Sequence, residues 1–255
     1  MYKSRYNNQN KFSTIAVVVL LFILFGGASG AYAQMFSVKS LPSKYSPPLA
    51  TIYLGVVPTD FHYKPSESGI DPQAGVFNFN DPVYRLGIDL AGLELAGTAG
   101  WNLGAQNNLN YFAFGIGFNS KYPVFRSQPF TLSLPLALKL EYTRVDDKKS
   151  GNITNDFRQN IGTIGSGLNG GFMLPHHIRI SLEGTASYGF STRSLGQSSG
   201  SAWIIENRDR IYFDRVMGQI GIVAGFDYRF TRFNSSGIQF DYGENNTAFI
   251  LGITF

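Results

Sequence analysis

Hydrophobic and polar residues alternate along much of this chain, and the alternation has a period of two. Its clearest example is the 13-residue segment from Phe130 to Tyr142. One face of this segment is apolar or aromatic, with Phe130, Leu132, Leu134, Leu136, Leu138, Leu140 and Tyr142. The other face holds Thr131, Ser133, Pro135, Ala137, Lys139 and Glu141. Successive side chains of a β-strand point to opposite faces, so the pattern predicts a strand with one apolar face. The segment exceeds the roughly 9–11 residues that a strand needs to cross a membrane.

The same alternation recurs along the chain and predicts ten strands. They are expected at residues 50–63, 82–90, 93–105, 109–119, 129–145, 157–173, 177–192, 209–230, 237–243 and 246–255. The chain after residue 33 has no apolar run long enough for a spanning helix. A chain that spans a membrane must then satisfy its backbone hydrogen bonds in a closed barrel. We therefore predict an all-β, antiparallel up-and-down transmembrane barrel of about 10 strands, with 8 or 12 as open alternatives.

The first 33 residues have the pattern of an export signal. They contain Lys3, Arg5 and Lys11 but no Asp or Glu, and an unbroken apolar run of 11 residues follows at 15–25. That length fits the roughly 7–15 residues of a signal-peptide core and falls short of the ~17–25 of a spanning helix. Ala31 and Ala33 have the spacing of a cleavage site. We predict a cleaved signal peptide at 1–33, a periplasmic lead-in at 34–48 and the barrel at 49–255; an uncleaved anchor is the alternative.

The end of the chain carries the most specific resemblance. Its last strand alternates apolar side chains at Phe249, Leu251, Ile253 and Phe255. A final strand that ends in an aromatic residue resembles the C-terminal signature of Gram-negative outer-membrane β-barrels, and the cleavage pattern is similar to that of exported Bacteroidota proteins. The resemblance implies that this strand is the signal for the barrel-assembly machinery. It also implies an integral protein of the bacterial outer membrane, surrounded by outer-membrane lipid and lipopolysaccharide.

The predicted inward faces collect ten charged residues, four cations and six anions. They are Arg85, Asp89, Glu94, Lys139, Glu141, Arg179, Glu183, Asp227, Arg229 and Asp241. An Arg or Lys on the lipid face would cost about 2–4 kcal/mol near the midplane, so these residues are expected to face the lumen. Most of them form opposite-sign pairs two or four positions apart on one strand, and residues at that spacing share a face. We predict a lumen ion-pair network.

Three functions are compatible with this architecture. The first, which we predict, is a narrow lumen plugged by the network, with a structural, adhesion or docking role. Extracellular loops 64–81, 146–156 and 193–208 would then contact a protein partner. The second is a small porin-like channel lined by the same charges.

The third is an outer-membrane hydrolase. His62 lies two positions from Asp60, so the two side chains share a strand face and can form a pair. A rim histidine between Phe61 and Tyr63 is the alternative that we favour. The other two histidines, His176 and His177, fall in a predicted periplasmic turn. Since no enzyme motif surrounds them, we predict no enzyme activity and no catalytic residue.

Charge and composition narrow the remaining choices. The chain has 21 basic and 17 acidic residues, and removal of the three basic residues in 1–33 leaves 18 against 17. A net charge of about +1 gives no support for a nucleic-acid partner. The chain has no Cys, so disulfides and thiolate chemistry are excluded. No cofactor or metal is predicted.

Overall fold

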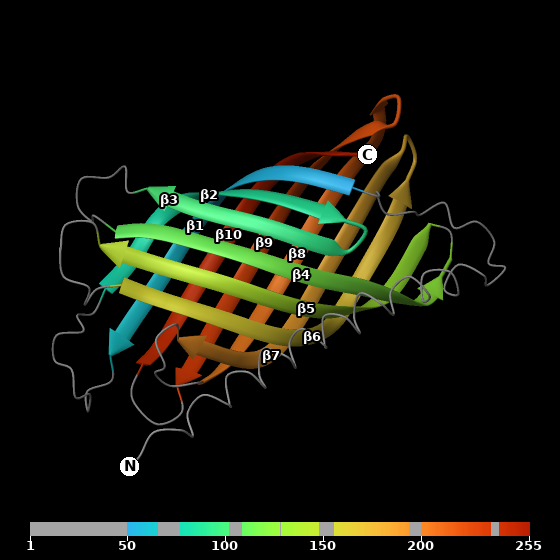
Figure 1. Ribbon diagram of the computed structural model, residues 1–255. Coiled ribbons are helices and arrows are strands. Elements are labelled where there is room, and N and C mark those ends of the chain that lie inside the picture. The colour runs from blue at the N-terminus through green and yellow to red at the C-terminus, as the bar shows by residue number, and fades with distance from the viewer. Residues whose placement is uncertain are drawn as a thin grey trace, which may run out of the picture. The chain divides into compact units, whose positions relative to one another are not determined.

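The computed structural model describes residues 50–65, 77–101, 109–127, 129–147, 156–193, 200–235 and 240–255, which form ten antiparallel strands (Figure 1). Their bounds are β1 Ala50–Pro65, β2 Phe77–Leu90, β3 Leu93–Trp101, β4 Leu109–Arg126, β5 Phe130–Asp147, β6 Asp156–Leu174, β7 Ile178–Arg193, β8 Gly200–Met217, β9 Ile220–Ser235 and β10 Phe240–Thr254. Consecutive strands pair, and β10 pairs with β1 to close the barrel. The predicted all-β up-and-down barrel is confirmed. Residues 1–49 lie outside the described ranges, so the signal peptide and the lead-in stay predictions.

The pairing register sets the tilt of the strands. From Thr51, successive paired residues on β2 through β10 lead back to β1 at Tyr63, twelve residues further along. Strands advance about 3.3 Å per residue and lie about 4.8 Å apart. A stagger of twelve residues over ten strands therefore corresponds to a tilt of about 40°, which is typical of closed barrels.

The two ends of the barrel differ. Short connections at residues 91–92, 127–129, 175–177 and 218–219 gather where β1 begins and β10 ends, and we call this the turn end. Ala91 and Gly92 have φ values of 51° and 100°, as a tight two-residue hairpin turn requires. The opposite end, which we call the loop end, is where the segments 66–76, 102–108, 148–155, 194–199 and 236–239 begin and finish. Those five segments lie outside the described residues.

Two predicted divisions between strands were wrong, and these errors cancelled in the count. The segment 209–230 is a hairpin rather than one strand, because β8 ends at Met217 and Gly218 turns the chain at φ 65°. Residues 237–243 and 246–255 belong to one strand, β10. In addition, β2 begins earlier than predicted, at Phe77, and β4 ends later, at Arg126. Two of the predicted loops are also shorter than expected. Residues 200–208 of the expected loop 193–208 lie in β8, and residues 77–81 of the expected loop 64–81 lie in β2.

The outside of the barrel is apolar and the inside is largely polar. On β5, Leu134, Leu136 and Leu140 are 41%, 49% and 54% exposed, whereas Thr131 and Ser133 are buried. On β10, Phe249, Leu251, Ile253 and Phe255 point outward and are exposed. Water disfavours such a surface, whereas lipid hydrocarbon accommodates it, and a closed barrel satisfies its backbone without water. The architecture is therefore that of a membrane-spanning barrel. Within the described ranges, no helix is long and apolar enough to cross a membrane.

Candidate functional site: the lumen

Two ion pairs cross the middle of the lumen. Arg229 on β9 forms a bidentate pair with Glu141 on β5. Lys139, also on β5, bonds to Glu206 on β8. β5 is not a neighbour of β8 or β9 in the sheet, so both pairs link opposite walls. All four side chains are less than 20% exposed. The pairs therefore occupy the cross-section of the barrel at this level.

Arg208 on β8 connects further strands to these pairs. Its guanidinium lies 2.7 Å from Glu94 on β3 and 3.6 Å from Glu206. The Tyr53 hydroxyl of β1 donates a hydrogen bond to the other oxygen of Glu94 at 2.9 Å. Tyr53, Glu94, Glu206 and Arg208 thus form one cluster that joins β1, β3 and β8. Arg208 lies between the carboxylates of Glu94 and Glu206, which would otherwise repel each other.

Asp227 on β9 is the centre of a second group. Arg210 binds its carboxylate through both terminal nitrogens. Arg85 on β2 lies 3.7 Å from the same carboxylate and donates from Nε to the Thr98 hydroxyl at 3.3 Å. Asp227 therefore balances one cation from the adjacent strand β8 and one from β2, from which it is separated by β10 and β1.

Two further contacts lie toward the turn end. Glu183 on β7 accepts hydrogen bonds from the Lys121 ammonium and the Asn119 amide, each at 2.7 Å. Arg179 forms a bidentate pair with Asp214, and its guanidinium carbon lies 4.7 Å from the centre of the Tyr212 ring. These contacts extend the charged part of the lumen to its turn end.

The pairing differs from the pairs that the sequence spacing suggested. Eight of the ten predicted residues lie on inward faces and take part in the contacts above: Arg85, Glu94, Lys139, Glu141, Arg179, Glu183, Asp227 and Arg229. Their partners come from other strands, because two positions along one strand span about 6.6 Å while the closed barrel brings opposite walls together. Asp89 instead accepts a hydrogen bond from the Gly92 backbone at 3.1 Å. The side chain of Asp241 lies outside the description.

Several charged residues of the lumen were not predicted: Lys121, Glu206, Arg208, Arg210, Asp214 and Glu244. Four of them lie on β8, which the sequence had divided between a loop and the following strand. The alternation of Trp203, Ile205, Ile211 and Phe213, all exposed, carried the signal that would have found them.

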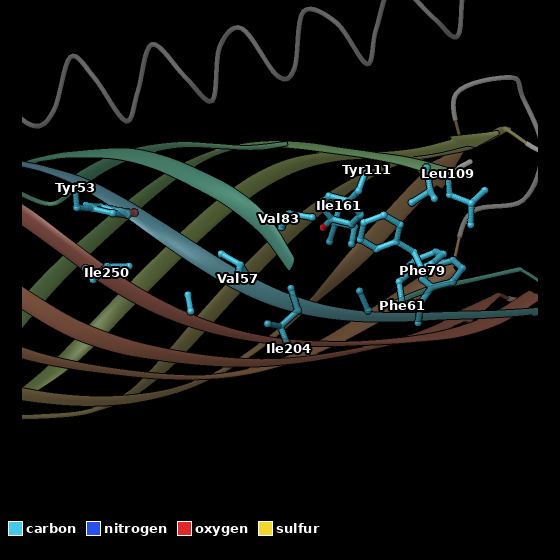
Figure 2. Close-up of a cluster of buried hydrophobic side chains, with 14 residues drawn as sticks. Tyr53, Val57, Phe61, Phe79, Val83, Leu109, Tyr111, Ile161, Ile204 and Ile250 are labelled. Atoms are coloured by element: carbon cyan, nitrogen blue, oxygen red, sulfur yellow. The ribbon is translucent and has the colours of Figure 1, made fainter. Parts of the chain in front are cut away.

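An apolar cluster fills the lumen toward the loop end. We call it the loop-end cluster; it consists of Val57, Phe61, Phe79, Val83, Leu109, Tyr111, Val145, Ile161, Ala202, Ile204 and Phe233, all of them buried. Figure 2 shows Phe61, Phe79 and Leu109 gathered at one end, while Tyr53 and Ile250 lie toward the other. The rings of Phe79 and Tyr111 are 5.4 Å apart between centroids. The expected position of Phe61 on the outer rim was wrong, since its side chain is 0% exposed inside the barrel.

A small cavity lies between the ion pairs and the loop-end cluster. Its volume is about 50 Å³, and its lining includes Glu94, Tyr111, Glu141, Arg208 and Arg229. One water needs roughly 10–15 Å³ of such volume, so the cavity has room for only a few waters. The Tyr111 hydroxyl donates to Glu244 at 2.5 Å and joins the apolar cluster to the polar region below it. Charged side chains and the loop-end cluster therefore occupy successive parts of the described lumen, with this small cavity between them.

The histidines lie outside this lumen site. His62 is on the outer face of β1, and its Nε2 lies 2.7 Å from Asp60 Oδ1 with both side chains partly exposed. His176 and His177 are in the turn between β6 and β7, with φ values of 62° and 61°. Among the residues that the structure describes, no three His, Cys, Asp or Glu side chains are grouped as metal ligands would be.

Comparisons with known proteins find similarity to several solved structures, each at low sequence identity. No protein-family model matches the chain, and no curated protein matches it. The outer membrane protease OmpT from Escherichia coli is 11% identical, with 86% of this chain and 100% of that chain covered and a TM-score of 0.48. The β domain of the Bordetella autotransporter BrkA is 11% identical, covers 81% and 99%, and has a TM-score of 0.36. Neisserial surface protein A is 16% identical, covers 80% and 97%, and has a TM-score of 0.26.

All three TM-scores lie below 0.5, so the architecture rests on the strand pairing and surface of this chain itself. A closed, antiparallel ten-stranded barrel with an apolar exterior and a polar, charged interior is the architecture of outer-membrane β-barrels. The resemblance seen in the sequence is confirmed at that level.

Proposed function

We propose that this protein is an integral outer-membrane β-barrel whose lumen is closed by its own side chains, with a structural, adhesion or docking role. The observation that carries the proposal is that two groups of side chains, the ion pairs and the loop-end cluster, occupy the lumen at different heights. Arg229–Glu141 and Lys139–Glu206 cross it at one level. The loop-end cluster fills it at the next. In this placement the turn end faces the periplasm and the loop end faces the outside, as in bacterial barrels with short periplasmic turns.

The energy of the ion pairs argues against a channel. A solute that passed this level would have to separate Arg229 from Glu141 or Lys139 from Glu206. Separation of one buried pair costs about 3–5 kcal/mol when the charges stay buried. Since 1.4 kcal/mol is tenfold in an equilibrium constant, even one open pair would be present in about one molecule in a hundred or fewer. A wide pore would also require movement of the loop-end cluster beyond the pairs.

Swelling of proteoliposomes tests the closed lumen. We expect vesicles that contain the folded protein to swell in isotonic arabinose no faster than empty vesicles, whereas vesicles with a general porin swell rapidly. Folding is checked by the altered gel mobility of the unheated barrel. Porin-like swelling of vesicles with folded protein would remove the proposal and favour the channel.

The docking part of the proposal concerns the segments that join strands at the loop end, at residues 66–76, 148–155 and 194–199. Shortening these segments to Gly-Ser linkers leaves the ten strands unchanged. We expect cells that export this variant to attach less to a protein-coated surface than cells that export the full chain. Equal attachment at equal surface amounts of folded barrel would count against adhesion.

A hydrolase is the second candidate, and the contact between Asp60 and His62 favours it. A carboxylate 2.7 Å from an imidazole nitrogen is an arrangement that orients a general base. Under the leading proposal, purified protein cleaves neither peptides nor phospholipids. Activity that is present in the full chain and lost in His62→Ala would establish the second candidate instead.

A further inference from the structure

A polar pair interrupts the apolar exterior of the barrel at half its height. Asn207 and Asp209 lie on the outward face of β8, and the Asn207 amide donates to Asp209 Oδ2 at 2.9 Å. Their own strand is apolar on both sides of the pair. Trp203 and Ile205 toward the loop end are each 52% exposed, and Ile211 and Phe213 toward the turn end are each 42% exposed. The pair is therefore enclosed within the apolar belt and does not belong to either polar rim.

The residues on neighbouring strands at the same height as the pair also belong to the apolar belt. Asn207 lies opposite Gly184 on β7 and Tyr228 on β9, and Asp209 lies opposite Leu182 and Phe226. With the twelve-residue stagger distributed over ten strands, the pair is level with Leu54 on β1 and Leu251 on β10, which are 65% and 64% exposed. Those leucines lie within the apolar belt, with further apolar residues on both sides, so the pair faces hydrocarbon rather than lipid headgroups.

The surface beside the pair is recessed. Gly184 and Ala186 are the outward residues of β7 at this level, and Ser166 lies opposite Ala186 on β6. A Cβ placed on Gly184 would meet no heavy atom within 4 Å, so the space outside it is open. On the far wall, β5 presents Leu134, Leu136 and Leu140 instead. Small residues next to a polar pair allow another protein surface to approach closely.

Hydrocarbon supplies no hydrogen-bond partner to this pair. Asn207 donates one of its two amide hydrogens to Asp209. The second amide hydrogen and the remaining lone pairs of the Asp209 carboxylate then need hydrogen-bond partners from another molecule. We propose that a second copy of this chain packs against the face formed by β7, β8 and β9. The two Asn207–Asp209 pairs then meet near a twofold axis, and each Asn207 donates to the Asp209 of the other copy.

Self-complementarity is the reason for choosing a second copy. The pair contains both a donor and an acceptor, and a twofold axis places the same surface on both sides of the interface, so each donor finds an acceptor. A partner that offers only a cation would satisfy Asp209 but would leave the Asn207 amide hydrogen facing lipid. Lipid headgroups are excluded by the depth of the pair. The inference rests on the membrane placement proposed above.

Cross-linking in membranes tests the interface. The chain contains no Cys, so each introduced cysteine is unique. Ala186→Cys places a thiol in the recess, and Leu136→Cys places one on the opposite wall as a matched control. Because residue 186 lies one strand away from the proposed twofold axis, the two thiols are separated by more than a disulfide can span, and a membrane-permeable bismaleimide is used to join them. Membranes of cells that export each cysteine variant are treated with this reagent. We expect a cross-linked band at twice the chain mass for Ala186→Cys, at least tenfold stronger than for Leu136→Cys.

Two sets of substitutions, each added to Ala186→Cys, test whether loss of the linked band comes from loss of the interface or from loss of folding. Replacement of Asn207 and Asp209 by Leu should reduce the linked band at least tenfold and leave the barrel folded, as its gel mobility shows. Gly184→Phe, which fills the recess and keeps the polar pair, should do the same. Asp209→Asn retains a donor and an acceptor and should keep most of the linked band.

Several results would overturn the dimer. They are equal linkage at Leu136→Cys, undiminished linkage after both leucine replacements, and a linked band of another mass, which would indicate a different partner. Absence of the protein from the membrane fraction would instead refute the membrane placement, so the two failures are distinguishable.

Discussion

The bidentate pair between Arg229 and Glu141 holds β9 and β5 together across the lumen, and its loss should be measurable as stability. Arg229→Met keeps the apolar stem and removes the guanidinium, so Glu141 is left with a side chain only 19% exposed and without its cation. Removal of one partner of a buried pair costs about 3–5 kcal/mol. The 50 Å³ cavity beside Glu141 admits a few waters, so we expect the lower value. About 3 kcal/mol is a change of more than a hundredfold in the unfolding equilibrium constant.

Urea unfolding of the barrel in phospholipid vesicles measures this change. Fluorescence of Trp203, which lies on the lipid face, and gel mobility report unfolding independently. Adding Glu141→Leu to Arg229→Met removes the unpaired carboxylate and should recover at least half of the lost stability. Arg126→Met, at an exposed position near the turn end, serves as the control and should change stability by less than about 0.5 kcal/mol. A double variant as unstable as Arg229→Met alone would refute the reasoning, because the cost could not then come from the unpaired carboxylate.

Three further substitutions test separate parts of the account by the same urea titration. Gly92→Ala should lose about 1–3 kcal/mol, because its φ of 100° suits Gly alone and its Cβ would lie 2.5 Å from the Asn119 carbonyl oxygen; an unchanged midpoint would contradict this turn geometry. Gly167→Ala should lose about 1–3 kcal/mol because its Cβ would lie 1.9 Å from the Gly184 carbonyl oxygen, whereas Gly184→Ala should change little; equal effects would argue against the β6–β7 register. Leu136→Arg should lose about 2–4 kcal/mol in a bilayer, and a smaller loss than for Leu136→Gln would contradict the lipid-facing assignment.

The strand pattern could be predicted where one face was consistently apolar. Leu134, Leu136 and their neighbours on β5 left no doubt about the strand or its outward face. The turn between β8 and β9 was missed because apolar residues continue on both sides of it, at Met217 and Ile220. Gly218 is the residue that signals a turn there, but a single glycine inside an alternating segment is also found within strands.

The contents of the lumen were less accessible from sequence. Periodicity tells which face a charge lies on, but the partner of Arg229 is 88 positions away, and its choice depends on closure and on the twelve-residue stagger. The loop-end cluster was missed for another reason. Near Val57 and Phe61, apolar residues occupy inward positions, so alternation alone cannot distinguish the lumen from the lipid face.

Cysteine accessibility along β5 tests the central claim most directly, because it reports on both faces of one strand. Single cysteines at the outward positions Leu136 and Leu140 and at the inward positions Ala137 and Thr143 are introduced into the chain, which has none of its own. In intact membranes we predict that the outward cysteines react with a lipid-soluble maleimide and not with a small charged thiosulfonate, while the inward cysteines react with neither until the barrel is unfolded. Rapid reaction of the inward cysteines with the charged reagent would show an open lumen. Rapid reaction of the outward cysteines with the charged reagent would show that the outer surface is in water. Either result would contradict the closed membrane barrel.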